Sequence, residues 1–150
     1  MKSRITKTAL ALLLLTSAIF TGCKKDDDNG NNDSLSISKE NLAATYTLSS
    51  IKIKATGYPE SDATGTFIDA CEKDDQLILK SDLTYEIKDM GTQCSPTSAD
   101  TGAWAISGTK ITIDGDESTV KSLTKGTLVL EDTYTQNNVT WTVTTTMNRK

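Results

Sequence analysis

The residues with the most distinctive chemistry in this sequence are its three cysteines, because the chain contains no histidine. Without histidine the chain lacks the commonest general base, the commonest zinc ligand and every Ser-His or Cys-His nucleophile pair. Cys71 and Cys94 form an even pair, and in an oxidising compartment such a pair predicts a disulfide. The alternative is a reactive or metal-binding thiol pair, for which the surrounding sequence offers no supporting ligands.

A group of acidic residues beside Cys71 is the next candidate for chemistry. The group consists of Asp69, Glu72, Asp74 and Asp75. Two carboxylates are enough for glycoside hydrolysis, but acids adjacent in sequence usually form a solvated rim. We therefore expect these side chains to lie in solvent, with glycoside chemistry as the alternative.

Asp114, Asp116 and Glu117 form a second acidic group, at a predicted tight turn. The group lacks the spaced oxygen ligands of an EF-hand loop, which favours a solvated turn over a Ca²⁺ site. The chain also has no glycine-rich phosphate loop and no HExxH or CxxC motif. We therefore predict that the protein is not an enzyme and that it uses no metal ion or cofactor.

The N-terminal residues have the composition of a secretory signal. Lys2, Arg4 and Lys7 supply a positive start, and an apolar run follows over residues 9–20. That run has about a dozen residues, whereas a helix that crosses a ~30 Å hydrocarbon core needs roughly 20, which argues against a permanent transmembrane anchor. Removal of residues 1–22 would take the net charge from −4 to −7, because they carry these three cations and no acid.

The sequence Phe20-Thr21-Gly22-Cys23 resembles the lipobox of bacterial lipoproteins, in which a peptidase cuts just before a diacylated cysteine. The resemblance implies a signal peptide over residues 1–22 and a lipid on Cys23, although Phe20 replaces the usual Leu. The alternative is an ordinary signal peptide followed by an accidental cysteine. Multiple acyl chains would make membrane attachment effectively permanent, since each buried CH₂ contributes ~0.8 kcal/mol.

The charged run Lys24-Lys25-Asp26-Asp27-Asp28 resembles the export tag of bacteroidete lipoproteins, which implies display on the outer face of the outer membrane. The alternative is a solvated charge run at the start of a tether. No apolar periodicity precedes Leu35, so residues 23–40 are predicted to form an acylated cysteine and a disordered acidic tether. The remaining residues 41–150 are enough for one domain, and their acidic character argues against a nucleic-acid partner.

Short apolar runs recur at intervals of about ten residues in the rest of the chain, separated by turn residues, which is typical of an antiparallel sandwich or barrel. We expect eight strands in up-and-down order, over residues 44–53, 76–80, 84–89, 102–106, 109–114, 117–122, 127–132 and 139–147. Eight strands can close into a barrel, which removes exposed edges. One short helical turn is expected at residues 38–43.

The hairpin between the second and third expected strands has a definite register. A three-residue loop at 81–83 pairs Leu79 with Tyr85 and Leu77 with Ile87, which puts all four apolar side chains on one face. A two-residue loop would mix the two faces, so we reject it.

The same register, continued along both strands, places Cys71 opposite Gln93 and one residue from Cys94, so a disulfide across the hairpin is geometrically reasonable. In the first strand a change of parity predicts a bulge near residues 49–50. Ser107-Gly108 is predicted to be the two-residue turn of the next hairpin.

These segments resemble the lipocalin-like domain that is found in many bacteroidete lipoproteins. The similarity spans residues 40–147 and rests on residues 42–51 (LAATYTLSSI), 71–75 (CEKDD), 81–85 (SDLTY), 94–96 (CSP) and 102–108 (GAWAISG). It implies an all-β fold, an eight-stranded antiparallel up-and-down barrel closed like a lipocalin, with Cys71 and Cys94 paired. Ala44, Tyr46 and Leu83 stand where the family usually has Gly, Trp and Gly, and a positive φ at Leu83 would cost roughly 1 kcal/mol.

The candidate ligand-binding residues are four aromatic side chains, Tyr46, Tyr85, Trp104 and Trp141. If they line a cavity, the protein is a surface-tethered barrel that binds a small apolar or glycan-like molecule; otherwise they simply fill a small barrel. The alternative function is that of a structural or accessory lipoprotein with no small-molecule site. Such a protein would contact an outer-membrane protein partner through residues 55–70, where Tyr58 and Phe67 are the large apolar side chains.

Overall fold

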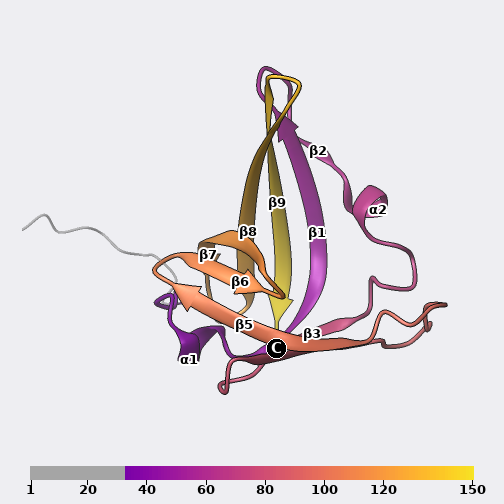
Figure 1. Ribbon diagram of the computed structural model, residues 1–150, viewed down its shortest axis with the longest axis vertical. Helices are drawn as coiled ribbons and strands as arrows, with labels where there is room; N and C mark the ends of the chain where they lie inside the picture. Colours follow the sequence, from indigo (N-terminus) through magenta and orange to yellow (C-terminus); the bar gives the residue numbers. More distant parts are fainter. Residues whose placement is uncertain (1–32) are drawn as a thin grey trace, which may run out of the picture. The chain divides into compact units, whose positions relative to one another are not determined.

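The computed structural model describes residues 33–150, and within them one antiparallel sheet closes on itself to form a barrel (Figure 1). The strands pair in chain order from β3 to β9, and β9 returns to pair with β1. The strands are β1 (Thr45–Ala55), β2 (Ser61–Asp62), β3 (Gln76–Leu79), β4 (Thr84–Lys88), β5 (Asp100–Ser107), β6 (Lys110–Ile113), β7 (Asp116–Leu123), β8 (Thr127–Gln136) and β9 (Val139–Arg149). The predicted all-β up-and-down barrel is confirmed. In addition to the eight expected strands, the two-residue strand β2 pairs with β1.

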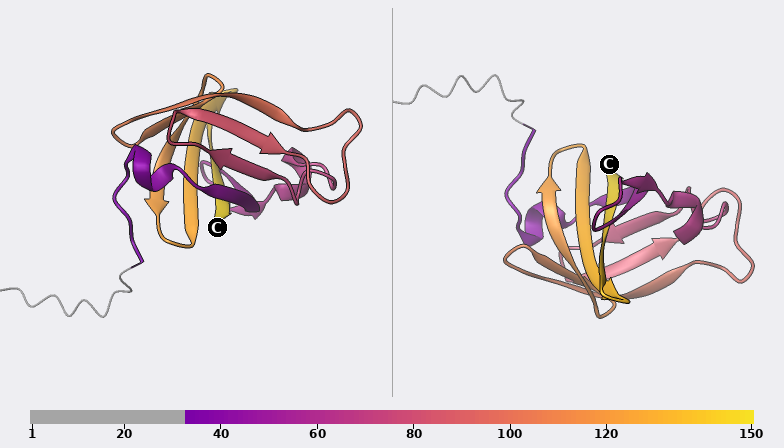
Figure 2. Two further views of the ribbon diagram at one scale, coloured as in Figure 1. Left: turned by 90° about the horizontal axis from the view of Figure 1, so that it is seen from below. Right: turned by 90° about the horizontal axis from the view of Figure 1, so that it is seen from above.

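Strand length divides the barrel into two parts. β3 pairs only with residues 45–47 of β1, and β7 pairs only with residues 128–131 of β8. Beyond those points β1, β8 and β9 continue together past the shorter strands (Figures 1 and 2). We call the closed part the lower barrel, and we call residues 53–55, 132–136 and 139–143 of the three long strands the extension.

The lower barrel holds the buried core, because side chains alternate between its inside and its outside along each strand. The buried apolar residues form one cluster of Leu42, Tyr46, Leu79, Tyr85, Trp104, Ile111, Val120, Leu123, Leu128 and Leu130. Gly102 faces Tyr85 across the β4–β5 pair, and a Cβ atom there would lie 2.6 Å from Tyr85 Cε1. Glycine at position 102 therefore leaves the space that the Tyr85 ring occupies.

The β3–β4 hairpin has the predicted register. Leu79 pairs with Tyr85 and Leu77 pairs with Ile87. Leu83 in the connecting loop has a φ of +68°, the left-handed conformation considered for it from the sequence. The expected bulge in β1 is also present, as a shift of the β1–β9 register between residues 48 and 50.

The β5–β6 hairpin turns one residue later than predicted. Ser107 pairs with Lys110, so the turn consists of Gly108 and Thr109 instead of Ser107 and Gly108. Both registers put the same side chains inside the barrel, so alternation along the strands does not distinguish them. Gly108 takes a φ of +60° at the first position of the observed turn.

The N-terminal part of the domain corrects the predicted tether. Residues 33–40 are ordered against the barrel, although the sequence predicts disorder over residues 23–40. The Leu35 N–H donates to the Leu123 carbonyl (2.9 Å), and Leu35 and Ile37 pack against the core cluster. The burial of part of their apolar surface against the core offsets the entropy that is lost when this stretch becomes ordered. The helix α1 (Lys39–Leu42) follows, where a short helical turn is expected.

Residues 55–70, expected to be an irregular connection, contain β2 and the short helix α2 (Thr64–Phe67). This segment is attached to β1 by the pairing of β2 with Lys52 and Ile53 and by hydrogen bonds beside that pairing. The Ile51 N–H donates to Thr64 Oγ1 (2.8 Å), and the Ala63 N–H donates to the Ile51 carbonyl (2.9 Å). The connection is therefore held along the side of the barrel above β3.

Three predictions concern residues outside the described part of the chain: the signal peptide over residues 1–22, the lipid on Cys23 and the charged run over residues 24–28. Within residues 33–150, no helix has both the length and the apolar character that a membrane crossing requires.

Candidate ligand-binding site

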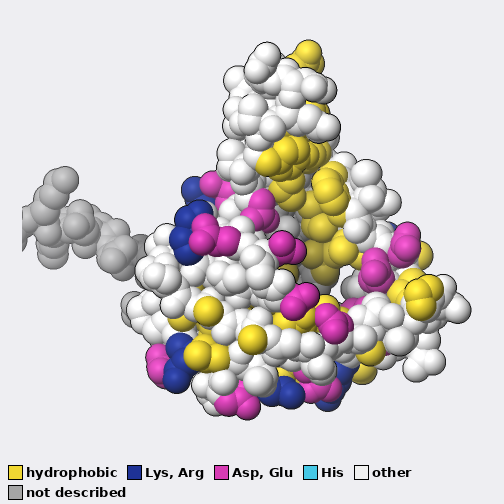
Figure 3. Space-filling model, in the orientation of Figure 1, with side chains coloured by type: hydrophobic (Ala, Val, Ile, Leu, Met, Phe, Trp, Pro, Cys, Tyr) yellow, Lys and Arg dark blue, Asp and Glu magenta, His cyan; other side chains and the backbone are white. Residues whose placement is uncertain are grey.

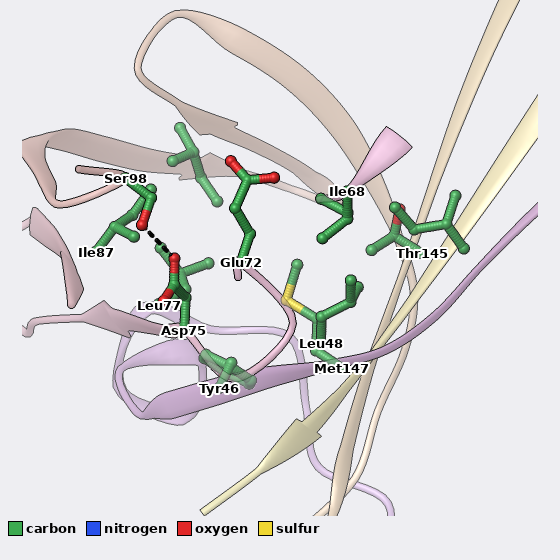
Figure 4. Close-up of a pocket in the computed structure, with 12 residues that line it drawn as sticks. Tyr46, Leu48, Ile68, Glu72, Asp75, Leu77, Ile87, Ser98, Thr145 and Met147 are labelled. Carbon is green, nitrogen blue, oxygen red and sulfur yellow. Dashed lines mark hydrogen bonds between the residues drawn. The ribbon is translucent and has the colours of Figure 1, made fainter. Parts of the chain in front are cut away.

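A cavity of about 310 Å³ opens where the lower barrel meets the extension, and Figure 4 shows side chains that surround it. Strands β1, β3, β4, β6 and β9 contribute inward-facing side chains to its walls. Residues 68–75 and Ser98, from the connections before β3 and before β5, close its outer side. The cavity is therefore built from the barrel wall and from two loops.

The barrel side of the cavity is apolar. Tyr46, Leu48 and Ile51 come from β1, and Thr145 and Met147 come from β9. Leu48 pairs with Met147 and Ile51 pairs with Thr145, on either side of the bulge. The bulge is what allows both Leu48 and Ile51 to face inward, because residues three apart in a regular strand point to opposite faces. Leu77, Ile87 and Ile113, from β3, β4 and β6, complete the apolar lining.

The loop side of the cavity carries two carboxylates, those of Glu72 and Asp75. Asp75 Oδ2 accepts a hydrogen bond from Ser98 Oγ (2.5 Å), and Asp75 Oδ1 accepts one from the Met90 N–H (3.0 Å). The Glu72 side chain rises between Ile68 and the Ser98 side of the cavity (Figure 4). Glu72 Oε2 accepts from the Asp69 N–H (2.9 Å), the one hydrogen bond of this carboxylate within residues 33–150.

These positions correct the expectation for two members of the acidic group, whereas Asp69 and Asp74 are exposed, as predicted. Glu72 and Asp75 line the cavity, whereas a solvated rim is predicted for them. Asp74 Oδ2 accepts weakly from the Thr92 N–H (3.4 Å), so this part of the group holds the loop before β5. Within the described residues, no three His, Cys, Asp or Glu side chains are placed to hold a metal ion.

A disulfide joins the two loops that close the cavity. Cys71 and Cys94 are bonded, with their Cα atoms 5.3 Å apart, as the sequence predicts. Asp89 Oδ2 supports the same loop by accepting from Thr97 Oγ1 (2.8 Å) and from the Cys94 and Ser98 N–H groups (3.3 Å each). The outer wall of the cavity is thus fixed by one covalent bond and by carboxylate hydrogen bonds.

The four aromatic candidates are not gathered in one site. Tyr46 lines the cavity; its hydroxyl donates to the Leu42 carbonyl (2.7 Å), and burial raises its pKa. Tyr85 and Trp104 are each 2% exposed and belong to the core cluster. Trp104 Nε1 donates to the Lys80 carbonyl (2.9 Å). Tyr85 donates to Asp100 Oδ2 (2.7 Å), and this hydrogen bond to a carboxylate raises the pKa of Tyr85 to about 12.

Trp141, the fourth candidate, lines a separate open cavity of about 490 Å³ in the extension. Ile53, Ala55 and Val139 share this cavity with it, and Tyr58 and Pro59 cover one side. The ring of Tyr134 stacks on Trp141, with centroids 6.5 Å apart and planes inclined by 11°. The space-filling view shows apolar side chains along the hollow face of the extension and acidic side chains around its lower end (Figure 3).

Asp114, Asp116 and Glu117 lie at the β6–β7 turn, which directly follows the cavity residue Ile113. Asp114 and Gly115 form the turn itself, with φ values of +51° and +90°. Glu117 forms an ion pair with Lys110 (3.4 Å). The arrangement is that of an exposed hairpin turn.

Most residues of the main cavity have no functional signal in the sequence. Alternation along β9 identifies Thr145 and Met147 as inward-facing, but it does not tell an inward residue beside a cavity from one in a filled core. Ile68 belongs to a connection and gives no periodic signal at all. The one sequence feature that points to the loop side of the cavity is the group of acidic residues next to the predicted disulfide.

Comparison with known proteins identifies the domain. A family model described as a lipocalin-like domain matches residues 42–130, more than half of the chain. The chain belongs to the lipocalin-like domain family. Searches among curated proteins and among solved structures gave no match. The lipocalin-like match ends within β8, so the cavity residues of β9 lie beyond it, although β9 closes the barrel.

Proposed function

We propose that this lipocalin-like protein binds a small apolar molecule in the cavity at the mouth of its barrel, and that it is not an enzyme. The observation that carries the proposal is the cavity of about 310 Å³, walled mainly by apolar side chains from five strands. Ligand pockets are typically ~300–1,000 Å³ and mainly apolar. A ligand that loses about 200 Å² of apolar surface gains about 5 kcal/mol before the costs of association.

The lining favours an apolar ligand over a glycan. The polar groups that face the cavity are few, and those of Asp75 and Ser98 are bonded to each other. A glycan would leave most of its hydroxyl groups unpaired against the apolar wall, which is unfavourable.

Residues 31–150 form one compact unit with every strand of the described residues, the core and the disulfide, so they are the natural protein for a binding test. We expect apolar ligands to raise the melting temperature and to perturb tryptophan fluorescence. Met147→Trp, which fills the cavity, should abolish both effects, whereas Thr135→Trp on the exposed outer side should preserve them. A panel of lipids, bilins and oligosaccharides with no effect on either signal would contradict the proposal.

We further propose that the domain is displayed on a cell surface by a lipid on Cys23, as in the bacteroidete lipoproteins whose signals the sequence resembles. About ten residues separate Cys23 from Asp33, and they span at most about 35 Å, so the barrel would stay close to the membrane. Cys23→Ser should release the protein from the membrane fraction. Protease added to whole cells should remove the wild-type protein, and complete protection would contradict surface display.

One observation supports the second candidate function, that of an accessory protein in an outer-membrane complex. Tyr58 and Phe67, on the connection between β1 and β3, are 67% and 49% exposed. If this surface contacts a partner, Phe67→Ser should release a co-purifying outer-membrane protein and leave ligand binding intact, because Phe67 lines neither cavity. Unchanged co-purification would exclude this surface.

A further inference from the structure

We infer that the ligand is a linear amphiphile with a cationic head group, which sits beside Glu72 while its tail follows the inner face of the extension toward Trp141. The inference rests on the proposed function, because it names the class of molecule that the cavity would take. Two independent observations carry it: an apolar path that leaves the cavity in one direction, and a surplus of negative charge at the other end.

The path is a stripe of inward-facing side chains on two paired strands. Ile51 pairs with Thr145, Ile53 pairs with Val143, and Ala55 pairs with Trp141. The first pair lines the main cavity and the third pair lines the open cavity in the extension, so the stripe joins the two. From Met147 to Val139 the path is about 26 Å long at ~3.3 Å per residue, which suits an extended chain better than a compact ring system.

The charge at the lower end of this path is entirely negative. Glu72 and Asp75 line the cavity, and its lining includes no lysine or arginine. Asp75 accepts hydrogen bonds from Ser98 and Met90, whereas within residues 33–150 Glu72 accepts only from the Asp69 N–H. A cation beside Glu72 would be attracted without displacing a cationic side chain, and an anion there would be repelled.

The test compares three probes with the same dodecyl tail: dodecyltrimethylammonium, dodecyldimethylamine oxide and tridecanoate, which are cationic, neutral and anionic at pH 7.5. Calorimetry on residues 31–150, below the micelle-forming concentrations, gives the three affinities. We expect the cation to bind about fivefold more tightly than the neutral probe at low salt, and the anion to bind most weakly. High salt should reduce the difference.

Two variants test whether the preference for the cationic probe depends on the Glu72 carboxylate. Glu72→Gln should bring the cationic probe to the affinity of the neutral one. Asp82→Asn makes the same charge change in the exposed β3–β4 loop, at the end of that hairpin away from Leu77 and Ile87, and should leave the ratio unchanged. Equal affinities of the three probes, or an unaltered ratio in Glu72→Gln, would overturn the charge assignment and leave the proposed function standing. Failure of all three probes to bind would contradict the proposed function itself.

The path of the tail is tested separately, by chain length and by the fluorescence of Trp141. Affinity should rise from octyl- to dodecyltrimethylammonium by up to about fourfold per buried methylene, and only the longer chain should change the fluorescence of Trp141. Trp141→Phe should remove that fluorescence change while calorimetric binding persists. An equal response to both chain lengths, or a response that survives in Trp141→Phe, would overturn the path along the extension.

Discussion

The three long strands β1, β8 and β9 run through both the lower barrel and the extension, with the same alternation of inward and outward side chains. Only the lower barrel has a buried core between these strands and the strands opposite them. In the lower barrel the inward residues of β1, β8 and β9 meet those of β3 to β7, and the core is buried. In the extension the same faces have no strand opposite them within the described residues. Unequal strand length therefore turns a continuous apolar face into a buried core at one end and an open apolar surface at the other.

The two tryptophans make the first and largest test of this comparison. Trp104 is 2% exposed in the core, whereas Trp141 is half-buried in the extension. We expect Trp104→Ala to lower the free energy of unfolding by about 3–5 kcal/mol, the range for large-to-small core changes. Trp141→Ala should cost about 1 kcal/mol or less. Chemical denaturation followed by circular dichroism measures both, and similar losses would show that the extension is not a separate environment.

The disulfide tests how the loops between the two parts are held. Cys71→Ser with Cys94→Ser should lower the free energy of unfolding by about 3 kcal/mol in the chain-entropy model. Because the bond joins the loops that close the cavity, ligand affinity should fall as well. Denaturation and calorimetry on residues 31–150, which contain no third cysteine, check both effects. An intact affinity would mean that the hydrogen bonds to Asp75 and Asp89 are sufficient to hold the wall.

Gly102 tests how tightly the lower barrel is packed. A Cβ atom at this position would lie 2.6 Å from Tyr85 Cε1, so Gly102→Ala should cost about 1–3 kcal/mol through displacement of the ring. Gly126→Ala is the matched control, because nothing lies within 4 Å of the added Cβ, and it should change stability by less than about 0.5 kcal/mol. Thermal unfolding of both variants measures the difference, and equal melting temperatures would contradict the close packing of Tyr85 against Gly102.

The smallest expected effect is the pH dependence of the Tyr85–Asp100 pair. The hydrogen bond to Asp100 raises the pKa of Tyr85 to about 12, above its ordinary value of 10.0. Between these values the unfolded chain loses the phenolic proton and the folded chain keeps it, so stability falls as the pH rises from 10 to 12. Tyr85→Phe should show less of this loss, and exposed Tyr58→Phe should behave as wild type. Urea titrations across this pH range would contradict the assignment if all three proteins followed one curve.

The acid side gives the complementary expectation. The same hydrogen bond, with help from the Thr101 N–H, holds the pKa of Asp100 below its ordinary value of 3.8. Stability from this carboxylate is therefore present above about pH 4 and is lost as the pH falls further. Tyr85→Phe should weaken this loss too, in the same titrations.

Much of the fold is predictable from the sequence because hydrophobic alternation and turn residues act locally. Leu79 and Tyr85 pair as predicted, since the alternative loop length would mix the faces of the hairpin. The position of the β5–β6 turn is not fixed by that argument, because moving it by one residue leaves the same side chains inside. The order of residues 33–40 is also missed, because Leu35 and Ile37 are too few to give a periodic signal.

The site is less predictable than the fold, for a different reason. The sequence identifies both Trp104 and Trp141 as inward-facing, but what stands opposite each depends on the lengths of distant strands. Glu72 illustrates the same limit: its carboxylate faces a cavity only because the loops containing Cys71 and Cys94 are joined over the barrel mouth.

The attachment of residues 33–37 to the barrel has a mechanical consequence. Two hydrogen bonds, from the Leu35 N–H to the Leu123 carbonyl and from the Lys125 N–H to the Asp33 carbonyl, form the bridge between Ser34 and Thr124 that holds this stretch. A pull on the chain ahead of Asp33 loads these few contacts first, before any strand of the closed sheet. Peeling residues 33–38 away releases about 20 Å of slack at ~3.4 Å per residue. The domain can therefore yield to traction from its N-terminal side while its barrel, and any molecule in it, stays intact.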